Sequence, residues 1–95
     1  MQTQVTFRHF KAQQPDLHDA AMTAADGFEK YMEGILSTEV IFTNDVDKTV
    51  EFFVKIKGDT IVAKEATKDF HRSLTDANDK IVRQLIKWKT KHTAK

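Results

Sequence analysis

The sequence predicts a two-layer α+β domain in the order strand, helix, three strands, helix, with a four-stranded sheet that carries both helices on one face. Two segments repeat apolar residues at the 3.6-residue period of a helix, and four segments are rich in β-branched and aromatic residues. Each helix must bury an apolar stripe and the sheet must cover one face, and a single shared core satisfies both needs. We find no repeat or linker, so we expect one domain over residues 1–95, ordered from about 4 to 91 with a basic tail at 92–95.

The first strand is expected at Gln4–Phe10. His9 shares the alternation of the apolar residues of this strand, which predicts a packed or capped histidine and not a functional one. The first helix is expected at Pro15–Met32, because proline suits the first helical position, with Gly34 as the C-terminal stop. Its apolar stripe follows the helical spacing and consists of Leu17, Ala21, Ala24, Phe28 and Tyr31.

Three strands follow at Ile35–Asn44, Lys48–Lys57 and Thr60–Thr67, separated by turns at Asp45–Asp47 and Gly58–Asp59. The middle strand alternates most cleanly between apolar and polar residues. Its apolar side consists of Val50, Phe52, Val54 and Ile56. Such alternation indicates a sheet with one covered face and one face open to water, as in antiparallel sheets.

The second helix is expected to begin after Asp69, a residue type that accepts hydrogen bonds from the free N–H groups of the first helical turn. Its apolar stripe consists of Phe70, Leu74, Ala77, Ile81, Leu85 and Trp88. At 100° per residue these side chains fall within about 40° of one direction. The pattern therefore predicts a strongly amphipathic helix that packs on the sheet.

The net charge of +1 hides a strong asymmetry along the chain. Residues 1–47 contain 3 Lys or Arg and 8 Asp or Glu, whereas residues 48–95 contain 12 Lys or Arg and 6 Asp or Glu. The last 16 residues hold 6 basic residues and no acidic one. A basic end of this kind suits a polyanionic partner, because each contact between a cation and a phosphate releases counterions.

Four cations of the second helix form a second stripe, which we call the cation ridge. Its members are Lys80, Arg83, Lys87 and Lys91. Their spacing of three or four residues puts them on one face, centred roughly 100° from the apolar stripe. Steps of about 5–6 Å along the helix approach the separation of successive phosphates on one nucleic-acid strand. Lys55 and Lys57 of the preceding hairpin add to this basic surface. A well-solvated helix face is the simpler interpretation of the same pattern.

Three segments resemble the ribosome hibernation-promoting factor family, whose members are also called ribosome-associated inhibitors or ribosomal subunit interface proteins. They are the strand Val5-Thr6-Phe7-Arg8-His9, the segment Glu29–Met32 and the run Asp79–Lys89. The resemblance extends from Gln4 to about Lys91 and corresponds to the short form of the family. It implies a β-α-β-β-β-α fold like that of double-stranded-RNA-binding domains. It also implies binding to the small ribosomal subunit in the channel of mRNA and tRNA, so that translation stops.

The resemblance also assigns RNA-binding residues. The family's RNA-contacting bases on the second helix match Lys80, Arg83 and Lys87, and its first-strand arginine matches Arg8. With Lys91, Lys55 and Lys57 from the charge pattern, these are the RNA-binding residues that we expect. The first helix departs from the family, because Ala24 and Gly27 stand where other members carry lysines.

The expected partners are the small ribosomal subunit and its 16S rRNA, bound by a cytoplasmic protein that is monomeric away from the ribosome. The alternative is a non-enzymatic scaffold whose basic helix binds an acidic protein or another polyanion. No Gly-rich phosphate loop, cysteine nucleophile or nucleophile elbow indicates an enzyme or a small-molecule substrate. The histidines share no ligand spacing, so we expect neither metal nor cofactor. No apolar run reaches the roughly 18–20 residues of a membrane span.

Overall fold

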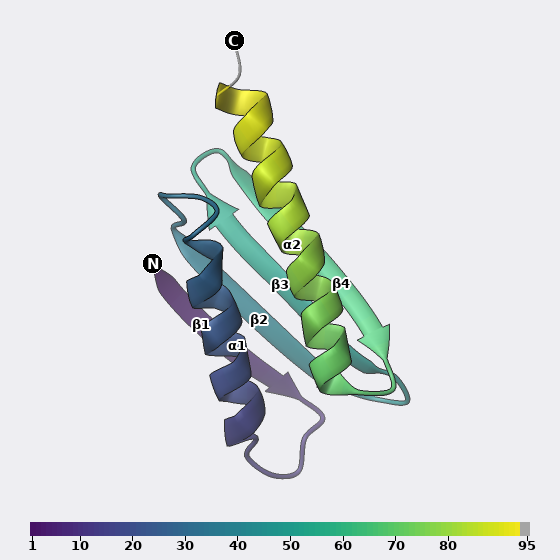
Figure 1. The fold of residues 1–95 in the computed structure, drawn as a ribbon. Helices are drawn as coiled ribbons and strands as arrows, with labels where there is room; N and C mark the ends of the chain where they lie inside the picture. Colours follow the sequence, from purple (N-terminus) through teal and green to yellow (C-terminus); the bar gives the residue numbers. More distant parts are fainter. Residues whose placement is uncertain (94–95) are drawn as a thin grey trace.

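Four strands and two helices follow one another in the predicted order (Figure 1). The strands are β1 (Gln2–Arg8), β2 (Ser37–Asn44), β3 (Lys48–Ile56) and β4 (Asp59–Thr67), and the helices are α1 (Pro15–Phe28) and α2 (Phe70–Thr93). The computed structural model describes residues 1–93. The helix α2 thus reaches two residues into the predicted tail at 92–95, and the rest of that tail lies outside the described residues.

The sheet has the strand order β1-β2-β3-β4 and is mixed rather than antiparallel throughout. β2, β3 and β4 pair antiparallel, whereas β1 pairs parallel with β2, with Val5 opposite Val40. The parallel pair arises because α1 carries the chain back to the starting end of β1 before β2 begins. Alternation of side chains along β1 does not distinguish these two directions, so the sequence pattern left the direction of this edge strand open.

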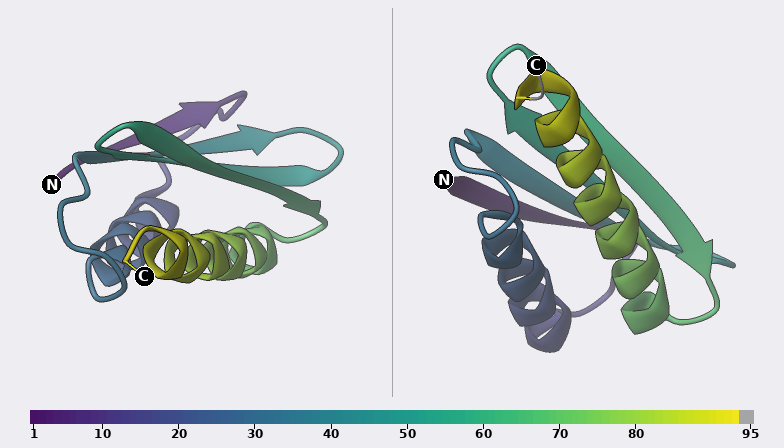
Figure 2. Two further views of the ribbon diagram at one scale, coloured as in Figure 1. Left: turned by 90° about the horizontal axis from the view of Figure 1, so that it is seen from above. Right: turned by 45° about the horizontal axis from the view of Figure 1, so that its top comes forward.

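Both helices cover the same face of the sheet, which confirms the predicted two-layer arrangement (Figure 2). α2 packs along β3 and β4, and α1 lies beside it over β1 (Figure 1). The core lies between the two layers. Its largest fully buried apolar side chains are Phe28, Phe42, Phe52, Ile81, Leu85, Val40, Val50 and Val54. The apolar phase of β3 is thus the covered face, as its alternation predicts.

The first strand ends earlier than the sequence predicts, at Arg8 instead of Phe10. His9 adopts a positive φ of 65° and is exposed, so the prediction that it packs in the core was wrong. The backbone reverses there, and Phe10 turns back to contact Phe7 edge-on with ring centroids 5.3 Å apart. Phe10 also contacts Phe70, at 5.3 Å. Packing of the Phe10 ring against these aromatic neighbours favours a strand that ends at Arg8 over one that continues to Phe10.

The first helix also ends early, at Phe28 instead of Met32. The next N–H groups continue with short-range bonds, among them Tyr31 N–H to the Phe28 carbonyl at 3.0 Å, before Gly34 turns the chain with a φ of 81°. Tyr31 is therefore 41% exposed instead of part of the apolar stripe. Ala25 is fully buried in the second half of α1, whereas Ala24 of the predicted stripe is only partly buried against the core.

Two boundaries around the hairpins differ from expectation. β2 begins at Ser37 instead of Ile35, and Leu36 is 54% exposed just before the strand. The tight turn between β3 and β4 consists of Lys57 and Gly58, one residue earlier than predicted. Gly58 has a φ of 84°, which glycine adopts without steric cost and which two-residue hairpins need.

The start of α2 confirms the predicted role of Asp69. Its carboxylate accepts a hydrogen bond of 3.3 Å from the Arg72 N–H, in the first helical turn. One turn further, the buried Ser73 hydroxyl donates to the Lys48 carbonyl at 2.5 Å and lies 2.8 Å from the Thr67 hydroxyl. These contacts join the first turn of α2 to the sheet. They set the direction in which the apolar stripe of the helix faces.

Candidate nucleic-acid interface

The packing of α2 places the cation ridge in solvent. Four members of the predicted apolar stripe are buried and two are partly buried; the buried ones are Leu74, Ala77, Ile81 and Leu85. All four cations of the ridge are exposed. Because α2 is one continuous helix of 24 residues, the ridge keeps the regular rise of about 6 Å between residues four apart.

Beyond the Ser73–Thr67 contact, two further side-chain contacts attach α2 to β4, the last strand of the sheet. The Gln84 amide donates a hydrogen bond of 2.9 Å from Nε2 to the Val62 carbonyl. One turn earlier, the Lys80 ammonium forms an ion pair with the Glu65 carboxylate. Side chains at 80 and 84 share one face of the helix. These contacts therefore hold the rotation of α2 so that the cation ridge runs along the free edge of the sheet.

Two shallow hollows lie along this edge. One, of about 240 Å³, is lined by Lys80, Arg83, Gln84 and Lys87. The other, of about 220 Å³, is lined by Asp59, Thr60, Ile61, Gln84, Lys87, Trp88 and Lys91. Gln84 and Lys87 line both, so the two hollows form one continuous surface that contains the whole cation ridge. An open, elongated and basic surface suits an extended polyanion better than an enclosed small molecule.

The four ridge cations are not equivalent. Lys80 is paired with Glu65, whose side chain is 21% exposed, against 53% for Lys80. Within residues 1–93, Arg83, Lys87 and Lys91 form no ion pair with a described carboxylate. Glu65 was missed at the sequence level because it is 15 residues from Lys80. The alternation of β4 could have revealed it, because Glu65 follows Ile61 and Ala63 at intervals of two residues and therefore lies on the helix-facing side of the strand.

The hairpin lysines lie at different distances from the ridge. Lys55 stands between the buried residues Val54 and Ile56, so it lies on the opposite, open face of the sheet. Lys57 is in the turn that precedes Asp59, which shares a hollow with Lys91. Lys57 therefore flanks the C-terminal end of the ridge, whereas Lys55 is separated from it by the sheet.

Arg8 is not brought to the ridge. It is the last residue of β1, at the edge of the sheet opposite to β4. Three strand spacings separate these edges, a distance of about 14 Å. Arg8 pairs in register with Thr43 and is exposed, so it remains accessible, but it belongs to a separate part of the surface.

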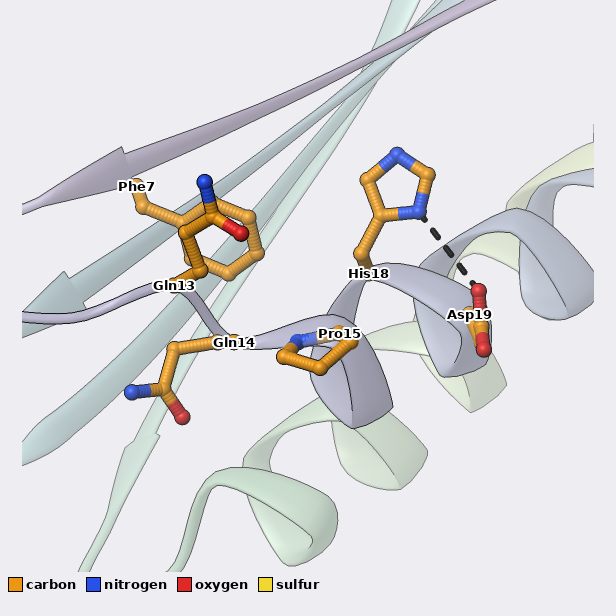
Figure 3. Close-up of a pocket in the computed structure, with 6 residues that line it drawn as sticks. All are labelled: Phe7, Gln13, Gln14, Pro15, His18 and Asp19. Carbon is orange, nitrogen blue, oxygen red and sulfur yellow. Dashed lines mark ion pairs between the residues drawn. The ribbon is translucent and has the colours of Figure 1, made fainter.

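A further hollow of about 340 Å³ lies at the start of α1 (Figure 3). It is lined by Phe7, Gln13, Gln14, Pro15, His18 and Asp19. The His18 Nδ1 atom lies 3.7 Å from an Asp19 carboxylate oxygen at its border. Across the described residues, no group of three or more His, Asp or Glu side chains is arranged to hold a metal ion. No helix of residues 1–93 has the length and hydropathy to cross a membrane.

Comparison with known proteins shows the family to which this fold belongs. The family model described as Sigma 54 modulation protein / S30EA ribosomal protein matches residues 3–93. The chain belongs to this family. Membership confirms the resemblance to the hibernation-promoting factors, and it makes the chain a ribosome-associated factor that is not an enzyme. A comparison with curated proteins gave no match.

Two solved structures share the fold of this S30EA family member. The N-terminal domain of Protein Y from Thermus thermophilus superposes with a TM-score of 0.81 at 17% identity, over 93% of this chain and 99% of that one. A ribosomal subunit interface protein from Coxiella burnetii gives a TM-score of 0.73 at 22% identity, over 95% of this chain and 99% of that one. Both similarities confirm the α+β architecture.

The S30EA chain lacks part of the basic surface on α1 that its family resemblance implies. Ala24 and Gly27 lie beside Asn78 and Val82 of α2, around a groove of about 240 Å³ between the helices. Lys30 is the one cation among the residues that line this groove. The helix α1 itself contains acidic residues and no lysine or arginine. The basic surface of the helical layer is therefore concentrated on α2.

Proposed function

We propose that this chain binds the 16S rRNA of the small ribosomal subunit through the basic edge of α2 and inhibits translation by occupying the channel of tRNA and mRNA. The observation that carries the proposal is the row of Arg83, Lys87 and Lys91, exposed and without an ion-pair partner among the described residues, along a helix attached to the sheet. Membership of a ribosomal protein family supports the ribosome as the polyanion.

The geometry favours recognition of the RNA backbone over recognition of base sequence. Cations at a regular helical rise match successive phosphates, and each contact releases counterions. The partly buried Trp88 packs against the core and is the one aromatic side chain that lines the two hollows of the ridge, whereas proteins that stack single-stranded bases use several aromatic side chains on an open face. Binding through shape and phosphates is typical of proteins that recognise folded RNA. The chain therefore binds a preformed rRNA surface and requires no unpaired sequence.

Inhibition by this chain is steric. The domain carries no catalytic step, so its effect follows from the space that it fills and from how long it stays bound. A monomer of 95 residues in the cytoplasm suffices for this role, since the ridge lies within one chain. The names of the two structural neighbours, Protein Y and a ribosomal subunit interface protein, support the same partner.

Competition on purified 30S subunits tests this function. The labelled chain is bound to 30S subunits, and a short mRNA with its cognate tRNA is then added at increasing concentration. Because both need the same channel, we expect the chain to be released in proportion to tRNA binding. Stable co-occupancy of the chain, mRNA and tRNA on the same subunits would rule out the channel. Binding to acidic proteins in preference to 30S subunits would favour the scaffold alternative.

A further inference from the structure

The carboxylate of Glu65 lies beside the cation ridge, and the proposed function does not explain it. Glu65 of β4 is 21% exposed and forms an ion pair with Lys80, the first cation of the ridge. Glu65 follows the buried Ile61 and Ala63 at intervals of two residues along β4, so its side chain lies on the side of the sheet that α2 covers. Lys80 also lines the hollow shared with Arg83 and Lys87. An acidic group thus sits beside the surface that is proposed to receive phosphates.

This pair differs from the other ion pairs that a Lys or Arg forms within residues 1–93. The pairs Lys68–Asp47 and Arg72–Asp76 have carboxylate side chains that are 56% and 40% exposed. Glu65 is less hydrated than either, and a carboxylate with less water around it holds its cation more strongly. A phosphate that approaches Lys80 must displace this carboxylate and is repelled by its charge. Arg83 and Lys87 have no such competitor among the described residues.

We infer that Glu65 limits the affinity of the RNA interface, because it occupies Lys80 in the place of a phosphate. Lys80 then contributes little to RNA affinity in the native protein, and Arg83, Lys87 and Lys91 provide the phosphate contacts. The inference rests on the proposed function. It assigns Glu65 the role of lowering the affinity, so that the chain binds RNA weakly enough to be released.

Four variants of the full chain test this role in binding to 30S subunits at several salt concentrations. Glu65→Gln keeps the shape of the side chain and removes its charge. It should free one cation, which raises the affinity roughly four- to fivefold at 0.15 M salt and steepens the salt slope by about 0.7–0.9. Glu65→Gln combined with Lys80→Ala removes both charges and should bind within about twofold of the native chain, since neither member of the pair contacts RNA. Lys80→Ala alone exposes the carboxylate and should weaken binding.

Glu51→Gln is the matched control. Glu51 lies in β3 beside the buried Phe52 and therefore on the open face of the sheet, away from α2. It changes the net charge by the same amount, so an affinity gain equal to that of Glu65→Gln would overturn the inference. A fall in affinity of fourfold or more in the double variant would also overturn it, because Lys80 would then already contact RNA. Thermal melting of each variant checks that the fold is kept.

A measurement without RNA separates this inference from the proposed function. Limited acylation of lysines, followed by mass spectrometry, should show Lys80 reacting more slowly than Lys87 in the native chain. In Glu65→Gln the two rates should become similar. Equal rates in the native chain would overturn the inference even if the ridge binds RNA. Conversely, unchanged 30S binding by an Arg83→Ala/Lys87→Ala variant would overturn the proposed function, whatever the acylation rates show.

Discussion

Replacement of Ile81 with alanine is expected to destabilise the fold by about 2–5 kcal/mol, which corresponds to a fall in the melting temperature of at least about 8 °C. Ile81 is fully buried in the centre of α2, between the helix and the sheet. Its truncation removes apolar contacts and leaves a cavity that the surrounding side chains fill only in part. Thermal or urea denaturation followed by circular dichroism measures the effect.

Ile86 provides the control within the same helix. It is 49% exposed, so Ile86→Ala removes the same atoms from a site that already contacts water. We expect a change within about 0.5 kcal/mol, as for ordinary surface substitutions. If the two variants melt at the same temperature, α2 does not pack with the face that the structure shows, and the position of the cation ridge would be wrong as well.

The largest functional effect is expected from Arg83→Ala/Lys87→Ala. Each phosphate contact contributes a factor of roughly four to five at 0.15 M salt, so the double variant should bind 30S subunits roughly 16- to 25-fold more weakly. Both side chains are exposed and line the same hollow, so the substitutions should leave the fold intact. Filter binding or co-sedimentation with purified subunits gives the dissociation constants.

Lys11→Ala/Lys30→Ala is the matched variant for this experiment. It removes the same two positive charges from exposed positions, one in the connection after β1 and one after the end of α1. Its affinity should stay within about threefold of the native chain, because distant surface charges are screened over a Debye length of about 8 Å at 0.15 M salt. An equal loss in both double variants would mean that net charge alone determines binding, without a specific ridge.

The periodic parts of the molecule were predictable from the sequence. Where one face of a helix or strand packs on the core, the spacing of its apolar residues predicts which side chains are buried. The buried residues of α2 follow this rule: Leu74, Ala77, Ile81 and Leu85. The same arithmetic places the ridge cations on an exposed flank. The type and order of all six elements were therefore predicted correctly.

The parts that depend on tertiary contacts were not predictable in this way. The first strand stops at Arg8 because Phe10 leaves it for a ring cluster that includes Phe70, which is far away in sequence. The separation of Arg8 from the ridge follows from the strand order, which alternation does not contain. The Glu65–Lys80 pair joins two elements whose contact exists only in the folded state. Each case needs the relative position of elements, which local periodicity does not encode.

The salt dependence of 30S binding tests the central claim most directly. The native chain is compared with Lys80→Ala/Arg83→Ala/Lys87→Ala in co-sedimentation from 0.05 to 0.5 M salt. The slope of log affinity against log salt is about −0.7 to −0.9 for each phosphate contact. We expect steep weakening with salt for the native chain, and weaker binding with a slope shallower by at least about 1.4 for the triple variant. Identical binding of the two proteins at every salt concentration would contradict an RNA interface on the basic edge of α2.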